Sequence, residues 1–208
     1  MRAFIYTGGP VYPDNITTEP DEEDLVIAAD SGYKNALALG VKRIDIFLGD
    51  MDSIGAIQPP EGAEVLQVPA EKDATDTQIA AETAIRHGAG EIVIIGGLDG
   101  RMDHTMANLG LLEDLWEKQI FTVICNGRNR VHFIRNNSIL IPRSKYKYLG
   151  LISVDERCRG VSVEGCKYEM KNRTLTRRQA FATSNELTGN CALVAVRKGG
   201  LLVIESMD

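Results

Sequence analysis

The sequence predicts an α/β protein in two parts, a parallel β-sheet flanked by helices followed by an antiparallel β domain. In residues 1–125, short apolar runs alternate with stretches of helical periodicity, which is typical of a parallel sheet covered by helices. After Gly127, short strand-like runs follow one another without a long helical period, and this predicts an antiparallel sandwich or barrel. We expect the boundary near Gly127 to Arg130, which gives domains 1–127 and 128–208.

Six strands are expected in the first domain, each a short and mostly apolar run. They cover residues 2–6, 25–29, 44–48, 65–68, 91–95 and 121–125. Of the three helices between them, the first is expected over 31–39 with Ser31 as its N-cap. Thr75 and Gln78 form a capping-box pair that opens the second helix. The third is expected over 103–118. Its predicted buried residues are Leu109, Leu112 and Trp116.

The second domain is expected to consist of short strands separated by turn pairs such as Asn136-Asn137 and Gly199-Gly200. The strands cover residues 131–134, 138–141, 148–154, 160–163, 191–197 and 201–204. Their order within a sheet does not follow from the sequence.

The two domains differ in charge. Residues 1–125 contain 22 Asp and Glu against 8 Lys and Arg, whereas residues 126–208 contain 7 against 15. A break of this size favours two domains with different functions. The basic residues are spread over strand-like segments without aromatic interleaving or an RNP-type motif, so nucleic-acid binding is not predicted. No apolar run approaches the roughly 20 residues of a membrane helix, and no secretory signal precedes the first strand, so a cytoplasmic location is expected.

Acidic residues follow several predicted strands of the first domain at the point where each strand ends. They are Asp30, Asp50 with Asp52, Asp73 with Asp76, and the Asp99 to His104 segment. Because ligands bind beyond the carboxyl ends of the strands in open parallel sheets, we expect these side chains to surround one site. Mg²⁺ prefers oxygen ligands and commonly takes one or two carboxylates together with substrate phosphates. The pattern therefore predicts magnesium and phosphate chemistry at this edge.

Each acidic motif also has a purely structural interpretation. Asp50 and Asp52 could form a turn or a helix cap, and Asp76 could stabilise the helix that it begins through the helix dipole. Asp103 could cap the third helix, but that interpretation leaves Arg101 without a role.

The glycine turn at residues 7–10 follows the first strand and could approach a phosphate. The sequence has no GxxxxGK[ST] loop, which excludes a P-loop enzyme, and no GxGxxG after the first strand. Taken alone, the glycine pair does not identify a ligand.

Five motifs, taken in order, resemble the thiamine pyrophosphokinase family. They are AADSG (28–32), GDMDS (49–53), KDATD (72–76), GGLDGRMDH (96–104) and TSNE (183–186), which together span nearly the whole chain. The resemblance implies a Rossmann-like nucleotide-binding domain with catalytic function, followed by an antiparallel β-sandwich for thiamine binding and dimerisation. It also implies Mg²⁺-dependent transfer of the pyrophosphoryl group of ATP to the hydroxyethyl group of thiamine, giving thiamine diphosphate and AMP. Members of the family are homodimers that hold thiamine where the subunits meet.

The resemblance also implies roles for the residues that match these motifs. Those implied to hold Mg²⁺ on the ATP phosphates are Asp50, Asp52 and Asp76, with Asp73 close behind. Those implied to line the nucleotide and phosphate pocket are Asp30, Arg101 and Asp103. Those implied on the thiamine side are Thr183, Ser184 and Asn185. Where many relatives carry a tryptophan near thiamine, this chain has Tyr168, whose ring can still stack on thiamine.

Three other functions would use some of the same residues. A diphosphokinase with a pterin alcohol as acceptor would keep the aspartates but would not need the TSNE segment. A phosphatase with a DxD nucleophile usually carries it on the first strand, whereas here DxD follows the third. A non-catalytic nucleotide or thiamine sensor would tolerate the loss of some acidic motifs, and this chain retains them all.

Overall fold

The structure, a computed structural model, describes residues 1–50, 61–69, 73–179 and 181–208. The chain forms two compact units, Met1–Gly127 (unit 1) and Arg128–Asp208 (unit 2). Among the helices of the described residues, none is long and apolar enough to cross a membrane.

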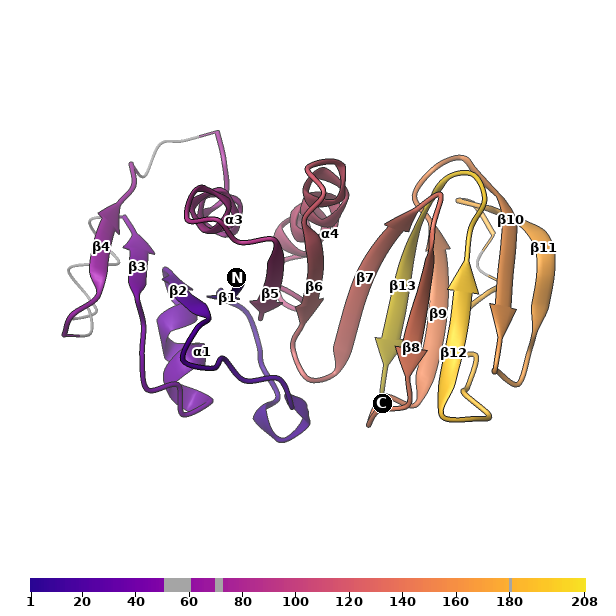
Figure 1. The fold of residues 1–208 in the computed structure, drawn as a ribbon, viewed down its shortest axis with the longest axis horizontal. Helices are drawn as coiled ribbons and strands as arrows, with labels where there is room; N and C mark the ends of the chain where they lie inside the picture. Colours follow the sequence, from indigo (N-terminus) through magenta and orange to yellow (C-terminus); the bar gives the residue numbers. More distant parts are fainter. Residues whose placement is uncertain (51–60, 70–72, 180) are drawn as a thin grey trace. The chain divides into compact units, whose positions relative to one another are not determined.

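Unit 1 contains the parallel sheet that the sequence predicts (Figure 1). Its strands are β1 (Arg2–Tyr6), β2 (Leu25–Ala29), β3 (Ile46–Gly49), β4 (Glu64–Gln67), β5 (Glu91–Ile95) and β6 (Phe121–Cys125). They lie in the order β4-β3-β2-β1-β5-β6, and each neighbouring pair is parallel. All six predicted strands are present, with β3 and β4 displaced by one or two residues from the expected ranges.

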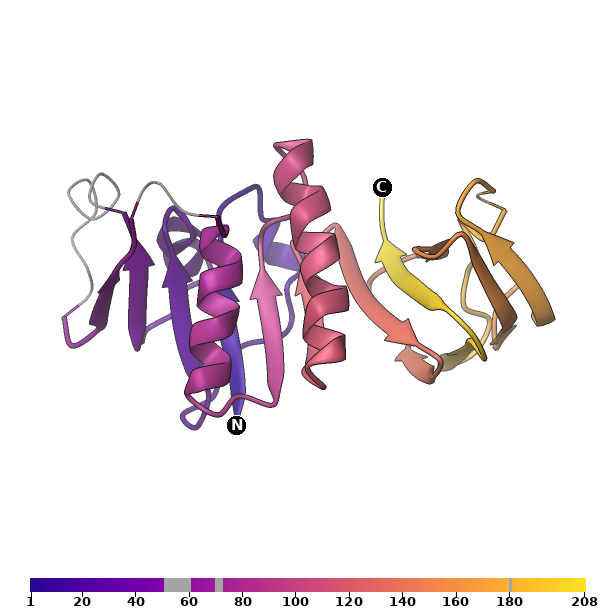
Figure 2. The same ribbon diagram turned by 90° about the horizontal axis from the view of Figure 1, so that it is seen from above.

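Helices cover both faces of the unit 1 sheet (Figures 1 and 2). The helix α1 (Gly32–Ala38) lies on one face, and α3 (Asp76–Arg86) and α4 (Met102–Glu117) lie on the other. A short 3-10 helix, η1 (Pro13–Asn15), lies in the connection between β1 and β2. This arrangement confirms the α/β fold with a Rossmann-like parallel sheet.

The two predicted helix caps differ in the structure. Thr75 caps α3 as expected, because its hydroxyl oxygen accepts a hydrogen bond from the backbone N–H of Gln78 at 3.2 Å. Ser31 occupies the predicted N-cap position of α1, but its side chain makes no capping hydrogen bond. The Ser31 hydroxyl lies against Gly8 instead, where a Cβ added to the glycine would come within 2.6 Å of Ser31 Oγ.

The buried face of α4 differs from the predicted one. Its buried residues are Asn108, Leu111, Leu112 and Leu115. Leu109 and Trp116, which were expected in the core, are only half-buried. The face is rotated because the polar Asn108 is buried, where its side chain donates to the carbonyl of Gly97 at 3.0 Å. Apolar periodicity does not reveal the buried face of a helix when one of the buried residues is polar.

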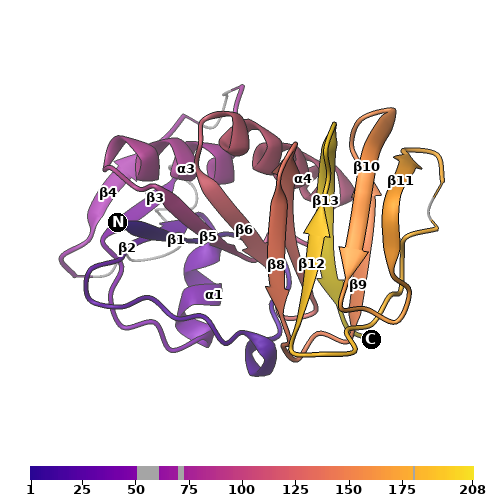
Figure 3. The ribbon, with the colours of Figure 1, turned by 45° about the vertical axis from the view of Figure 1, so that its right-hand side comes forward.

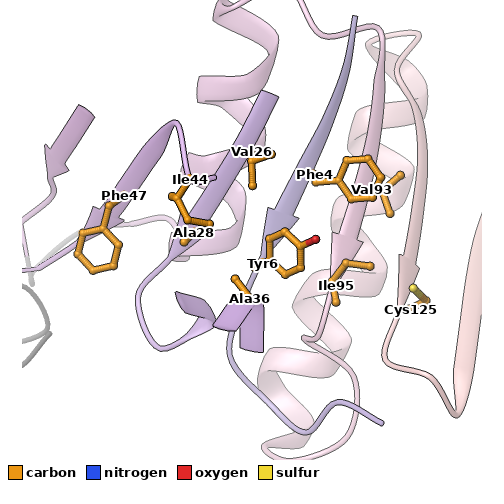
Figure 4. Packing of buried hydrophobic residues seen from close by; sticks show 10 residues of the cluster. All are labelled: Phe4, Tyr6, Val26, Ala28, Ala36, Ile44, Phe47, Val93, Ile95 and Cys125. Carbon is orange, nitrogen blue, oxygen red and sulfur yellow. The ribbon is translucent and has the colours of Figure 1, made fainter. Parts of the chain in front are cut away.

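A cluster of aromatic and aliphatic side chains packs against the sheet on the side of α1 (Figure 4). Phe4 and Tyr6 of β1 and Phe47 of β3 are its largest members, and Ala36 is contributed by α1. Burying a side chain of this size stabilises the fold by roughly 1.5–3 kcal/mol. At Gly32 of α1, an added Cβ would lie 2.1 Å from the carbonyl oxygen of Tyr6, so the helix and the strand are in direct backbone contact.

Unit 2 consists of two antiparallel sheets (Figure 3). Its strands are β7 (Asn129–Arg135), β8 (Ser138–Pro142), β9 (Tyr148–Ser153), β10 (Arg157–Glu164), β11 (Met170–Thr176), β12 (Cys191–Ala195) and β13 (Gly200–Ser206). One sheet has the order β7-β13-β9 and the other β11-β10-β12-β8. Side chains alternate between partly buried and fully buried along β9, as in a sandwich in which one face of the sheet packs in the core. The predicted antiparallel β-sandwich is confirmed.

Strand β11 was not predicted from the sequence. This strand lies at the edge of its sheet, and most of its residues are polar and exposed, including Lys171 and Arg173. It therefore lacks the apolar run by which the other strands were recognised.

Candidate active site

A cavity of about 480 Å³ lies in unit 1 where loops leave the carboxyl ends of the parallel strands. It is lined by residues 7–9 after β1, residues 29–31 at the end of β2, residues 74–77 at the start of α3, and several residues within 97–108. We call it the strand-end cavity. Its location agrees with the edge at which open parallel sheets bind ligands.

Close backbone contacts hold the loops after β1 and β5 together in this cavity. The N–H of Gly97 donates to the carbonyl of Gly8 at 2.7 Å. Gly96 has a φ of 99°, and a Cβ there would lie 2.5 Å from the carbonyl oxygen of Thr7, so only glycine fits. The Asn35 side chain of α1 donates to that same carbonyl at 2.7 Å. The turn at residues 7–10 is therefore fixed in position beside the cavity.

Two hydroxyl groups meet at the wall of the cavity. The Oγ1 atoms of Thr7 and Thr77 lie 2.8 Å apart in a buried hydrogen bond. This bond joins the end of β1 to the first turn of α3 across 70 residues of sequence. Neither hydroxyl group was predicted to have a role, because a single hydroxyl carries no motif of its own.

Asp30 and Asp76, two of the predicted acidic residues, line the strand-end cavity. Asp30 has a positive φ of 51°, and its N–H donates to the carbonyl of Leu48 at 2.7 Å, which ties the end of β2 to that of β3. Asp76 is the first residue of α3, directly after the cap Thr75. The structure thus brings two carboxylates from separate segments to one cavity.

Among the described residues, the other acidic side chains predicted to hold or adjoin the metal do not line the cavity. Asp50 follows β3 at the same edge of the sheet, but it does not belong to the residues that line the cavity. Asp73 is exposed and does not line it either. Asp52 lies outside the described residues.

Arg101 lines the cavity. Asp103 does not line it, but its carboxylate is hydrogen-bonded to the Arg101 side chain. The guanidinium donates to the Asp103 carboxylate from Nη2 at 2.6 Å and from Nε at 3.2 Å. This pairing raises the pKa of Arg101 and lowers the pKa of Asp103. Both groups are therefore ionised at neutral pH, and both are exposed to solvent.

Asp99, which begins the acidic segment predicted at this edge but was given no individual role, also lines the cavity. Its φ is 59°, and its carboxylate accepts a hydrogen bond from Nδ2 of Asn126 at 2.8 Å. Asn126 is fully buried directly after β6. A buried amide thus orients this exposed carboxylate.

The described residues contain no group of three or more His, Cys, Asp or Glu side chains close enough to bind a metal ion by themselves. A site for Mg²⁺ does not require such a group, because this ion commonly uses one or two carboxylates and completes its shell with phosphate oxygens and water. The donors present at the cavity, carboxylates of Asp30, Asp76 and Asp99, are of the type that Mg²⁺ prefers.

Unit 2 has a second pocket, of about 570 Å³, which we call the unit 2 pocket. Of the residues predicted on the thiamine side, Tyr168, Thr183 and Asn185 line it, whereas Ser184 does not. Apolar residues form part of the wall and include Leu149, Leu151, Val163, Met170 and Phe181.

Three charged side chains also line this pocket. They are Glu169, Lys171 and Arg173. The carboxylate of Glu169 accepts a hydrogen bond from the N–H of Gly165 at 3.0 Å. None of the three was predicted from the sequence, and Lys171 and Arg173 belong to strand β11, which carries no apolar signal.

Comparisons with known proteins agree with this arrangement. The model of the thiamin pyrophosphokinase catalytic domain matches residues 17–125, and that of the thiamin pyrophosphokinase vitamin B1 binding domain matches residues 136–201. The chain is 30% identical over 211 residues to the thiamine pyrophosphokinase of Bacillus subtilis (strain 168), covering 98% of each sequence.

Solved structures of such proteins have the same fold over the whole chain. The crystal structure of thiamine pyrophosphokinase from Bacillus subtilis is similar with a TM-score of 0.86 and 26% identity, covering 100% of both chains. That of thiamin pyrophosphokinase from Geobacillus thermodenitrificans is similar with a TM-score of 0.84 and 26% identity, covering 100% of this chain and 98% of the other. Sequence, fold and the two family models lead to one conclusion: the chain belongs to the thiamin pyrophosphokinase family.

Proposed function

We propose that unit 1 binds ATP in the strand-end cavity and that unit 2 binds thiamine in its pocket. The observation that carries the proposal is that Asp30, Asp76 and Arg101, from three separate segments, line one cavity at the carboxyl edge of the sheet. A pocket with Tyr168 and Phe181 in its wall is suited to the two aromatic rings of thiamine.

The reaction is that of the family. The enzyme transfers the pyrophosphoryl group of ATP to the hydroxyethyl group of thiamine and forms thiamine diphosphate and AMP. The alcohol oxygen of thiamine attacks the β-phosphorus, the bond from that phosphorus to the α-phosphate oxygen breaks, and the alcohol proton leaves to a base. Catalysis of such a transfer depends mainly on positioning and on stabilising negative charge.

The residues of the strand-end cavity fit these tasks. The fixed turn after β1 presents backbone groups to the phosphate chain, and Arg101 can donate hydrogen bonds to a charged phosphate oxygen. Asp103 holds the guanidinium of Arg101 before the substrate arrives. A carboxylate of the cavity accepts the alcohol proton in this proposal.

Magnesium is proposed as the cofactor, held by Asp50, Asp52 and Asp76 with Asp73 close to them. Asp76 lines the cavity, and Asp50 follows β3 at the same sheet edge, which supports the proposal. The ion would neutralise charge on the phosphates as it builds up during transfer. Asp30, Arg101 and Asp103 are assigned to the nucleotide and its phosphates, and Tyr168, Thr183, Ser184 and Asn185 to thiamine.

We further propose that residues 1–127 form the catalytic domain and residues 128–208 the thiamine-binding and dimerisation domain of a cytoplasmic homodimer. The two compact units and the separate family models for each part support the division. Size-exclusion chromatography with light scattering tests the dimer, and a monomer that retains full activity would exclude it.

Substitution of the proposed metal ligands tests the catalytic assignment. We expect Asp50→Asn and Asp52→Asn each to lower kcat at least about 100-fold, because a metal-bound phosphate loses several kcal/mol of charge stabilisation. Mass detection of thiamine diphosphate and AMP gives the rate, and circular dichroism checks the fold. Asp114→Asn, on the exposed face of α4, is the control. Near-normal rates in both variants at saturating Mg²⁺ would refute the metal role.

An assay of AMP release with different acceptors distinguishes the proposed function from a pterin diphosphokinase and from a non-catalytic sensor. With ATP and Mg²⁺ present, thiamine should support AMP release, and a pterin alcohol should not. A sensor would bind thiamine or ATP without releasing AMP, so AMP formation in this assay excludes that class.

A further inference from the structure

The side-chain amide of Asn185 holds the backbone of Tyr168 from both sides. Its Oδ1 accepts a hydrogen bond from the N–H of Tyr168 at 3.0 Å, and its Nδ2 donates to the carbonyl of Tyr168 at 2.8 Å. The two bonds link residues 17 positions apart in the sequence. Because one partner is a donor and the other an acceptor, this pairing also settles which end of the amide is oxygen.

Asn185 itself is fixed. Its backbone N–H and carbonyl pair with Leu149 at 3.0 and 2.8 Å, and its Oδ1 accepts a second hydrogen bond, from the N–H of Glu186, at 3.0 Å. An amide oxygen has two lone pairs, so its acceptor capacity is used. With only 8% of the residue exposed, the amide has little surface left for a ligand.

The Tyr168 ring has the opposite environment. The residue is 61% exposed and lines the unit 2 pocket, together with Phe181, which is 52% exposed. The N–H of Lys167 donates to the carbonyl of Glu186 at 2.8 Å, so the residue next to Tyr168 is tied to the same segment. A rigid backbone therefore carries an exposed aromatic ring into the pocket, and such an arrangement reduces the entropy lost when a ligand stacks on the ring.

From these contacts we infer that Asn185 is a positioning residue, which acts on thiamine through Tyr168 and does not contact it. The inference rests on the proposal that the unit 2 pocket binds thiamine. It replaces the direct thiamine contact that the resemblance implies for Asn185, and it explains why a buried amide belongs to this site.

A double-mutant cycle tests the inference. We expect Tyr168→Ala and Asn185→Ala each to raise the KM for thiamine about 10-fold, with kcat and the KM for ATP nearly unchanged. If Asn185 acts through the ring, the double variant should also show about a 10-fold rise, since groups in one network are not additive. Asn190→Ala, an exposed asparagine outside the pocket, is the matched control and should leave the KM unchanged alone and add nothing to Tyr168→Ala.

A spectroscopic measurement follows the ring directly. The chain has a single tryptophan, Trp116, so Trp116→Phe with Tyr168→Trp leaves one reporter in the pocket. Thiamine should quench its fluorescence, and adding Asn185→Asp should weaken that titration about 10-fold. Aspartate keeps the acceptor oxygen but sets a carboxylate against the Tyr168 carbonyl, and as a close isostere it serves if Asn185→Ala does not fold.

The outcomes distinguish failure of the inference about Asn185 from failure of the proposed thiamine site. A KM for thiamine that is unchanged in Tyr168→Ala overturns the proposed thiamine site. If instead Tyr168→Ala raises the KM and the double variant shows a rise of about 100-fold, the site stands and Asn185 has an effect of its own, which overturns the inference. An unchanged thiamine titration in the Asn185→Asp reporter would also overturn it.

Discussion

Arg101 and Asp103 form a two-bond ion pair on a solvent-exposed surface, with the arginine side chain 73% exposed and lining the strand-end cavity. An exposed pair of this kind contributes little to folding stability, because water and salt screen it. Its geometry has a different consequence. The carboxylate holds the planar guanidinium in one orientation. If ATP binds in this cavity as we propose, a phosphate oxygen can replace or share those hydrogen bonds.

Removing the guanidinium should therefore impair ATP use more than it affects the fold. We expect Arg101→Gln to lower kcat/KM for ATP about 10- to 100-fold, the equivalent of one or two hydrogen bonds to a charged group. The melting temperature should stay within a few degrees. Lys118→Gln breaks another exposed ion pair of the same region, with Asp114 at 2.7 Å, and should change neither quantity. Equal losses in both variants would show that the effect is not specific to Arg101.

Because the hydroxyl groups of Thr7 and Thr77 are hydrogen-bonded to each other, we expect the single and double valine variants to differ in stability in a non-additive way. Thr7→Val leaves the buried Thr77 hydroxyl without its partner, which should lower the free energy of unfolding by about 1–3 kcal/mol. Replacing both threonines by valine removes the whole hydrogen bond and should be less destabilising than the sum of the single changes. Urea unfolding followed by circular dichroism measures all three variants. Strict additivity would contradict the pairing.

The acidic and the basic side chains that line the unit 2 pocket should have opposite effects on the KM for thiamine. Thiamine carries a permanent positive charge, so Glu169→Gln should raise its KM about 2- to 5-fold and Lys171→Gln should lower it by a similar factor. Both effects should nearly vanish at about 1 M salt, where the Debye length is about 3 Å. Lys198→Gln changes the charge of unit 2 outside the pocket and serves as the control. Shifts of the same sign in both pocket variants would argue that thiamine binds elsewhere.

A buried carboxylate in unit 2 predicts loss of stability in acid. Glu205 has a side chain only 4% exposed, and Arg130 donates to both of its oxygens at 2.5 and 2.6 Å. Burial alone would raise the pKa of Glu205, but the nearby His132 and the hydrogen bonds from Arg130 outweigh it and leave the pKa below its ordinary value of 4.5. A depressed folded-state pKa stabilises the fold above the unfolded-state pKa, and that contribution is lost as the pH falls through the folded-state value.

We therefore expect Glu205→Gln to lower the free energy of unfolding by about 3 kcal/mol at pH 7, because Arg130 loses its counter-charge. The difference from the unaltered protein should shrink steadily below about pH 4.5, as the native carboxylate becomes protonated too. Urea unfolding across pH 3 to 7 measures it. A difference that is constant over this range would rule out the carboxylate charge as the cause.

Local sequence signals located most elements of the fold. The apolar runs placed every strand of the unit 1 sheet, and the Thr75 cap was found because capping depends on residues only a few positions apart. Where a residue departs from the usual pattern, the prediction was wrong. The buried Asn108 concealed the inner face of α4, and the polar edge strand β11 carried no apolar signal.

The sequence indicated part of the lining of the strand-end cavity, but it did not indicate how the lining residues are connected. The motifs identified Asp30, Asp76 and Arg101, which the structure places around one cavity. The hydrogen bond between Thr7 and Thr77 joins residues 70 positions apart in the sequence, and those between Asn185 and Tyr168 join residues 17 positions apart. No local sequence pattern marks either pair.

By itself, the sequence determined the α/β class, the family and the acidic edge of the leading sheet, because apolar periodicity and short motifs act over a few neighbouring residues. Only the tertiary structure decided which side chains line a cavity and which are held in hydrogen bonds beside it. That distinction depends on hydrogen bonds between distant residues, as at Asn185, where burial assigns the amide to a backbone partner and leaves the ring of Tyr168 exposed in the pocket.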